Sequence, residues 1–267
     1  MKKISVIIPS YNHKAFVEAA IASAAAQECD NFEVETIVID DGSLDGSVDL
    51  LRELHSMGKY PFKLVTKPNE GLCRTLNRAI REYSKGDLVA VLASDDMWTP
   101  DKLRTQVEIL SQNPEAELCF SNARTFGEGR QAGNSSAFLF SGRVLSPLTI
   151  YNFVPAGTML FHRRLFDRIG GFDETGLKLE DWDFLLRAAA RTQFCNSPRN
   201  LLLYRIHGES SLERMRRNGI LYDEKMKVLA KNRAITNAVL RMISCVLHFA
   251  LDRVYRPLRY RFQEFRA

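Results

Sequence analysis

The alternation of strand-like and helix-like segments in the first half of the chain is the feature that most restricts its fold. Short runs rich in β-branched residues alternate with segments of helical spacing; the runs lie at 5–8, 35–39, 63–66 and 88–92, and the helical segments at 15–26, 48–57, 72–83 and 101–111. Consecutive parallel strands need crossover connections of this kind. The pattern therefore predicts an α/β fold with a mainly parallel, Rossmann-like central sheet flanked by helices.

The charge is distributed unevenly along the chain. Residues 214–267 contain 13 Lys+Arg and 4 Asp+Glu, whereas residues 1–213 contain 24 and 28. Residues 1–213 are long enough for one large α/β domain. We therefore expect an acidic α/β domain over 1–213, followed by a basic amphipathic helical extension over 214–267.

Three polar clusters follow predicted strands. They are Pro9-Ser10-Tyr11-Asn12, Asp40-Asp41-Gly42-Ser43 and Ser94-Asp95-Asp96. Each cluster taken alone has the composition of a turn. Ligands of open α/β sheets bind outside the carboxyl ends of the strands, and adjacent carboxylates repel unless they share a cation or a proton. Two paired carboxylates at this edge therefore favour a site for a divalent ion held together with substrate phosphates.

Several motifs occur in an order and spacing that resemble the family 2 glycosyltransferases of the GT-A fold. The stretches that carry the resemblance are 6–12, 40–43 with Asp45, 69–71 with Asn77, 94–98, 170–174, 180–183 and 204–207. Each motif is weakly specific by itself, whereas the ordered set is strongly specific. The resemblance covers roughly residues 4 to 211 and implies a GT-A fold and an activity that transfers sugars from nucleotide-diphosphate donors.

The resemblance implies a set of binding residues at the sheet edge. The residues expected to contact the nucleotide, most simply that of a UDP-sugar, are Pro9, Tyr11, Asn12, Asp40, Asp41, Gly71, Arg74, Ser94 and Asp95. Asp95, Asp96 and His207 are the expected ligands of Mn²⁺ or Mg²⁺, which would stabilise the departing diphosphate. The family often has Asp-x-Asp-Asp where this chain has Ala93-Ser94-Asp95-Asp96, so the first carboxylate is missing.

Asp181, with Glu180 beside it, matches the catalytic base of the family. Inverting transfer requires a carboxylate that takes the proton of the acceptor hydroxyl. Another interpretation is that Asp181 only stabilises a helix N-terminus through the helix dipole, an effect of ~0.3–1 kcal/mol.

The resulting hypothesis is a metal-assisted, inverting hexosyl- or N-acetylhexosaminyl-transferase that acts on a saccharide or polyprenyl-linked acceptor. The loss of a carboxylate at Ala93 leaves an alternative, a non-catalytic module that binds nucleotide-sugars or recruits partners to membranes. A sugar-nucleotidyltransferase should carry a Gly-rich basic phosphate loop after the first strand, and a dinucleotide-dependent oxidoreductase should carry GxGxxG there. Residues 9–12 match neither pattern.

The basic tail contains an amphipathic segment at 239–258. Its apolar side comprises Val239, Ile243, Val246, Leu247, Ala250, Val254 and Leu258, and the other side carries Arg241, Ser244, His248, Asp252, Arg256 and Arg259. One interpretation is a helix packed on the domain or on a second copy in a homodimer, with its basic residues in solvent. The other is an interfacial helix that makes peripheral contact with a membrane. No nucleic-acid motif is present, so nucleic acid is not an expected partner.

The location expected from the sequence is cytoplasmic, with possible peripheral contact at the inner face of the cell membrane. The apolar run 4–8 ends at Pro9 and is too short for a signal sequence. The five cysteines are scattered and odd in number, which is untypical of a disulfide framework.

Overall fold

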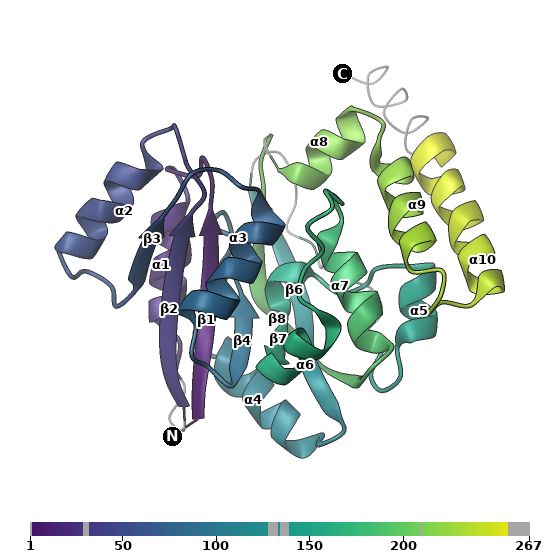
Figure 1. Cartoon of the computed structure of the whole chain (residues 1–267), viewed down its shortest axis with the longest axis horizontal. Helices are drawn as coiled ribbons and strands as arrows, with labels where there is room; N and C mark the ends of the chain where they lie inside the picture. Colours follow the sequence, from purple (N-terminus) through teal and green to yellow (C-terminus); the bar gives the residue numbers. More distant parts are fainter. Residues whose placement is uncertain (1, 29–31, 128–132, 134–138, 209, 256–267) are drawn as a thin grey trace.

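The structure is a computed structural model, and it describes residues 2–28, 32–127, 133, 139–208 and 210–255. A single eight-stranded sheet runs through the molecule in the order β3-β2-β1-β4-β7-β6-β8-β5 (Figure 1). The strands are β1 (Lys2–Ser10), β2 (Phe32–Asp40), β3 (Lys63–Thr66), β4 (Leu88–Val91), β5 (Met97–Trp98), β6 (Ala116–Gly127), β7 (Leu160–His162) and β8 (Gln193–Ile206).

The strands β1 to β4 form a parallel half-sheet, as the sequence predicts. β1 pairs in parallel with both β2 and β4, and β2 pairs in parallel with β3. β7 is antiparallel to β4 and β6, whereas β6 and β8 are again parallel. The mainly parallel sheet of the prediction is therefore confirmed, with antiparallel strands in the half formed later in the chain.

Helices cover both faces of the sheet because alternate strand residues point to opposite sides. The helices are α1 (Val17–Ala25), α2 (Ser47–Ser56), α3 (Leu72–Arg78), α4 (Lys102–Gln112), α5 (Leu145–Ile150), α6 (Arg163–Ile169), α7 (Glu180–Ala189), α8 (Ser211–Arg217), α9 (Leu221–Lys231) and α10 (Ala238–Phe249). Short helical turns lie at Ala79–Tyr83, Ala156–Thr158 and Ala250–Tyr255.

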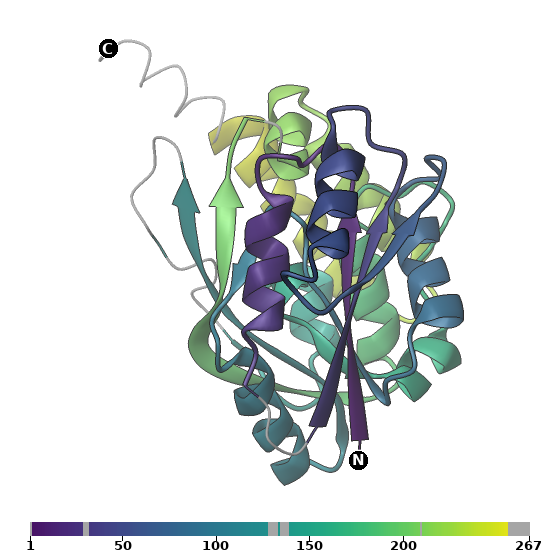
Figure 2. The same ribbon diagram turned by 90° about the vertical axis from the view of Figure 1, so that its left-hand side faces the viewer.

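Two apolar cores result, one on each face of the sheet. Val6 and Ile8 pack with α1, α2 and α4, whereas Ile7 packs with α3, α5, α6, α7 and α9. Figure 2 shows α1, in purple, lying beside the strands on the first of these faces. The α/β/α layering is that of the GT-A fold that the resemblance implies.

The predicted boundary between residues 213 and 214 falls inside α8. Val228 and Leu229 of α9 belong to the same core cluster as Ile7 and Phe161. The tail helices α9 and α10 lie at the opposite end of the molecule from α2 (Figure 1). No helix of the described segments is long and apolar enough to span a bilayer.

The helix α10 packs on the domain with its polar side and exposes its apolar side, the reverse of an ordinary surface helix. Ser244 and His248 are buried, whereas Val239, Met242 and Val246 are exposed. The helix thus contacts the domain through its polar side, and its apolar side is not packed on the domain; whether a second copy or a membrane covers that side stays a prediction. Residues 256–267, which hold the last arginines and aromatics of the tail, lie outside the described residues.

Candidate functional site

The three polar clusters predicted from the sequence meet at one edge of the sheet. β2, β1 and β4 are neighbours, so their carboxyl ends lie side by side. Ser10 is in register with Asp40, and the Asp41 N–H donates to the carbonyl of Ser10 at 2.8 Å. The prediction that these clusters lie together is confirmed.

The loops after β1 and β2 are bonded to each other. Asn12 adopts a left-handed conformation with φ 53°, which asparagine tolerates better than most residues. Its Oδ1 accepts from the N–H of Leu44 at 2.8 Å, and its own N–H donates to Ser43 Oγ at 2.9 Å. Asn12 therefore fixes the geometry of the loop that carries Tyr11, whose side chain is 45% exposed. Pro9 is partly buried at the end of β1.

Asp45 adds a second connection between these loops. Its carboxylate accepts from the Lys14 N–H at 2.9 Å and from the hydroxyl and N–H of Ser47. Partial burial by itself would raise the pKa of Asp45, but these hydrogen bonds outweigh it and lower the pKa. The carboxylate is thus held ionised at the start of α2.

Asp40 and Asp41 have all four carboxylate oxygens engaged by the protein. Asp40 accepts from the N–H and hydroxyl of Ser43, at 2.8 and 2.6 Å. Asp41 accepts from the N–H groups of Glu70 and Gly71, each at 2.9 Å, and from Lys67 Nζ. These two residues therefore shape the loops of the predicted nucleotide pocket, and their contact with the nucleotide stays a prediction.

Gly71 directly precedes α3 and has φ 88°. A residue with a side chain would be strained in this conformation. The Gly71 N–H donates to Asp41, and Gly71 lines a pocket of about 460 Å³. Arg74 lies on the same wall, 3.6 Å from Glu174, and Glu180 lines the pocket as well. The structure thus brings Gly71, Arg74 and Glu180 around one cavity, and their contact with a nucleotide-sugar stays a prediction.

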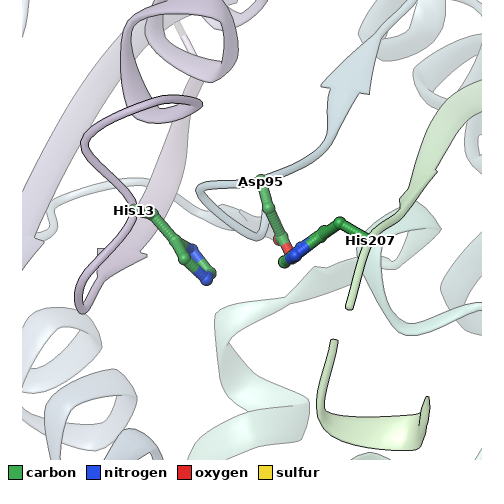
Figure 3. A group of neighbouring side chains, drawn as sticks. All are labelled: His13, Asp95 and His207. Carbon is green, nitrogen blue, oxygen red and sulfur yellow. The ribbon is translucent and has the colours of Figure 1, made fainter. Parts of the chain in front are cut away.

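A second cluster lies at the end of β4. Asp95, His207 and His13 place potential ligand atoms within 4.8 Å of one another, and their side chains converge in Figure 3. His207 Nε2 is 3.0 Å from Asp95 Oδ2, and His13 Nδ1 is 2.8 Å from the Ser94 hydroxyl. Asp95 and His207 were both expected as metal ligands, and the structure brings them together.

His13 has no role in the sequence-based prediction, yet it completes this cluster. The pKa of His13 is lowered, chiefly because burial disfavours the charged imidazolium. A neutral imidazole is the form that binds metals. Its position directly after the Pro9–Asn12 cluster at a strand end was the feature that could have identified it, because the end of β4 lies beside the end of β1.

Among the described residues, the cluster of potential metal ligands contains Asp95, His207 and His13 but not Asp96. It is buried below the loop, where it accepts from the Arg205 N–H at 2.8 Å. Burial and the neighbouring Asp95 raise its pKa well above the ordinary range. The geometry therefore does not support the expectation that Asp96 is a metal ligand, because two successive residues of this turn point in different directions.

Glu180 and Asp181 open α7, and both are partly exposed. Burial and the adjacent Asp181 raise the pKa of Glu180 to about 8. Burial also raises the pKa of Asp181, against the opposing effect of hydrogen bonds that include one from Asn152 Nδ2 at 3.1 Å. A raised pKa makes a carboxylate a better proton acceptor near neutral pH, so the pair fits general-base chemistry.

Asn77 of α3 is bonded to the loop that precedes Glu180. Its amide donates to the carbonyl of Phe172 at 2.8 Å and to Glu174 at 2.7 Å, and its Oδ1 accepts from the Phe172 N–H. A Cβ atom at Gly171 would lie 2.6 Å from the Asn77 oxygen, so glycine is required for this close approach. Asn77 thereby fixes the loop that leads to Glu180 against α3.

Comparison with curated proteins identifies related sequences. An uncharacterized glycosyltransferase of Nostoc sp. is 26% identical over 78% of this chain and 66% of its own length. The putative teichuronic acid biosynthesis glycosyltransferase TuaG of Bacillus subtilis is 34% identical over 41% of this chain and 42% of its own length. The chain spans about three fifths to two thirds of the first relatives, with 66%, 63% and 59% of their lengths covered.

Solved structures share the fold at low identity. S. aureus TarS 1–349 in complex with UDP-GlcNAc superposes with a TM-score of 0.66 at 19% identity, over 96% of this chain and 74% of that chain. A mannosyltransferase from Pyrobaculum calidifontis in complex with GDP-Man and Mn²⁺ gives 0.64 at 17% identity, over 96% and 82%. The sequence model of glycosyl transferase family 2 matches residues 5–170, which is more than half of the chain. The chain belongs to glycosyl transferase family 2.

Proposed function

We propose that this chain transfers a sugar from a nucleotide-diphosphate donor to an acceptor hydroxyl, with a divalent cation held at Asp95, His207 and His13. The observation that carries the proposal is the convergence of these three side chains at the sheet edge, next to the loops fixed by Asp41 and Asn12. TarS has been solved in complex with UDP and with UDP-GlcNAc, which supports a UDP-sugar as donor. The transferred sugar is proposed to be a hexosyl or an N-acetylhexosaminyl group.

The donor set suits a cation such as Mn²⁺. Carboxylate oxygen is a ligand for both Mn²⁺ and Mg²⁺, but imidazole nitrogen favours the transition metal. His13 and His207 supply nitrogen ligands, and His13 compensates for the carboxylate that is missing at Ala93. When bound, the cation would neutralise charge that develops on the departing diphosphate. This compensation weakens the alternative of a degenerate, non-catalytic module.

Asp181 is the proposed base of an inverting transfer. Its carboxylate would accept the proton of the acceptor hydroxyl as that oxygen attacks the anomeric carbon. Asn152, which donates to Asp181 Oδ2, holds the carboxylate in one orientation. Burial and the adjacent carboxyl raise the pKa of Glu180, which favours a single negative charge on the pair.

The acceptor is proposed to be a saccharide or a polyprenyl-linked saccharide. The pocket beside Glu180 is open and has both polar and apolar lining residues, among them Leu177, Lys178 and Met215. The similarity to TuaG, named for teichuronic acid biosynthesis, supports a role in polysaccharide assembly.

The experiment that tests the proposal is a donor screen with the complete chain. UDP-, GDP- and dTDP-sugars are incubated with Mn²⁺, with Mg²⁺ or with chelator, while nucleotide release and thermal shift are recorded. We expect one nucleotide class to stabilise the protein in a metal-dependent manner and to be turned over slowly. Asp181→Asn should retain donor binding and lose transfer, because only the proton acceptor is removed.

Two results would contradict the proposal. Donor binding without turnover by the wild type, with every saccharide acceptor offered, would favour the non-catalytic module. Full activity of Asp181→Asn would remove Asp181 as the base, and Glu180→Gln would then be the matched variant to measure.

A further inference from the structure

The helix α10 presents its apolar side to solvent. The exposed large apolar residues of this region are Val239, Met242, Ile243, Val246, Leu247, Phe249 and Val254, and we call this set the outer face of α10. It contains seven of the thirteen exposed large apolar side chains among the residues whose burial is described. At 100° per residue they fall on one continuous side of the helix. An exposed apolar patch of this kind marks an interaction surface.

The inner side of α10 is polar and is bonded to the domain. Ser244 Oγ donates to the carbonyl of Ile150 at 2.9 Å, and His248 stacks on the ring of Tyr151 with centroids 5.9 Å apart. Lys225 of α9 donates to Asp252 at 2.6 Å and lies 3.0 Å from His248 Nδ1. Turning the helix to bury its outer face would break these contacts, so its orientation is built into the structure.

The net charge of the segment that carries the outer face indicates what covers it. Residues 214–267 carry a net charge of +9 from 13 Lys+Arg and 4 Asp+Glu. Arg253 lies among the outer-face residues by helical position; its side chain is 40% exposed and pairs with Asp223 at 2.8 Å. The sequence continues through residues 256–267 with four arginines, one glutamate and the aromatic residues Tyr260, Phe262 and Phe265. A basic apolar surface matches anionic lipid headgroups above an acyl layer.

A second copy of the chain fits this surface less well. A two-fold contact through α10 would place the same residues of both copies against each other. Both copies would then bring a segment of the same net positive charge to one contact, and like charges repel. A bilayer surface has the opposite charge and no such conflict.

We propose that the outer face of α10 docks on the surface of an anionic lipid bilayer, with the helix lying in the plane of the interface. The described helical run from Ala238 to Tyr255 measures roughly 27 Å, and it is not apolar enough to cross a hydrocarbon layer of about 30 Å. The polar contacts of Ser244 and His248 keep the domain on the water side of the helix.

The test is vesicle co-sedimentation of the complete chain, without nucleotide or acceptor. Vesicles of phosphatidylcholine alone are compared with vesicles that also contain phosphatidylglycerol, at low and high salt. We expect binding to the anionic vesicles that weakens with salt. Val246→Glu should weaken it at least about tenfold, because a charge is placed in the middle of the apolar side.

Met57→Glu is the matched control. Met57 is 67% exposed and Val246 is 66% exposed, but Met57 follows α2 at the far end of the molecule. Its vesicle binding should equal that of the wild type, and both variants should keep the wild-type unfolding temperature because both sites are exposed.

Three outcomes would overturn the proposal. Failure to sediment with either kind of vesicle would exclude lipid docking, and unchanged sedimentation of Val246→Glu would exclude the outer face. A dimer in analytical ultracentrifugation that dissociates in Val246→Glu, without vesicle binding by the wild type, would show that a second copy covers α10. Because the assay contains no donor, its result is independent of the transfer activity.

Discussion

Two loops at the same edge of the sheet carry adjacent aspartates, and the protein uses them in different ways. After β2, each oxygen of Asp40 and Asp41 accepts a hydrogen bond from the protein. After β4, Asp95 faces His207 and His13, whereas Asp96 is buried and accepts from a backbone N–H. The same dipeptide therefore organises loops in one case and offers a candidate ligand in the other. The number of internal donors around each carboxylate, rather than its sequence motif, distinguishes the two.

The largest effect is expected at Asp41. Its carboxylate and Lys67 form an ion pair in which each side chain is only 6% exposed. Asp41→Asn leaves the Lys67 charge buried without its main partner. The remaining carboxylate is that of Glu70, whose Oε2 lies 3.8 Å from Lys67 Nζ. We expect a loss of about 3 kcal/mol in the free energy of unfolding, measured by urea denaturation without donor.

Asp49→Asn is the matched control for this measurement. The Asp49 side chain is 85% exposed on α2, so its substitution should have almost no effect on stability. If Asp41→Asn were equally neutral, the loop after β2 would not be organised by its carboxylates and the comparison would fail.

Asp95→Asn should act on activity instead of stability. The substitution removes the only charged oxygen donor of the three-residue cluster. We expect transfer with Mn²⁺ to fall by about 100-fold, equivalent to about 2.7 kcal/mol in the barrier, while the unfolding temperature stays near that of the wild type. A loss of stability similar to that of Asp41→Asn would mean that both loops are organised in the same way.

His13→Gln tests whether the cluster has a third ligand. Removal of the imidazole should weaken Mn²⁺ affinity roughly tenfold, as measured by calorimetric titration. His55→Gln, at an exposed position on α2, provides the control. Unchanged affinity in His13→Gln would limit the candidate site to Asp95 and His207.

The smallest effect is expected at Asp96, and it depends on pH. Burial and Asp95 raise the pKa of Asp96 well above 3.8, so the folded state holds its proton more tightly than the unfolded state does. The stabilisation from this proton is complete below about pH 4 and is lost as the pH rises toward the folded pKa.

Asp96→Asn cannot titrate at this position. Its unfolding free energy should be within about 1 kcal/mol of the wild type near pH 4, and the variant should become relatively more stable as the pH rises. Thermal unfolding across a pH series measures this difference. A wild type that gains stability over the variant with rising pH would show that Asp96 is ionised and paired.

Sequence periodicity and strand-end chemistry predicted much of this arrangement. The runs 5–8, 35–39 and 88–92 identified β1, β2 and β4, because β-branched runs bounded by turn residues are local features. The helices α5 and α6 were not predicted, since each is short and lacks a clear apolar period.

The role of His13 and the side-chain direction of Asp96 depended on information that spacing does not contain. His13 and His207 are brought within 5.9 Å of each other by the sheet order, which no local pattern specifies. Asp96 was misplaced because adjacent residues in a turn have different side-chain directions. The periodicity of α10 correctly defined its apolar side, but it did not show which side of the helix packs on the domain.

The inner side of α10 also has a consequence for regulation. Its contacts at Ile150 and Tyr151 end one residue before Asn152, which donates to Asp181. Anything that steadies α10 would thus also favour one conformation of the segment that holds the proposed base. Thermodynamic coupling is reciprocal, so an acceptor that favours the same conformation would strengthen attachment to the surface. An enzyme of this construction would work faster where its substrate is anchored and would stay there longer while the substrate lasts.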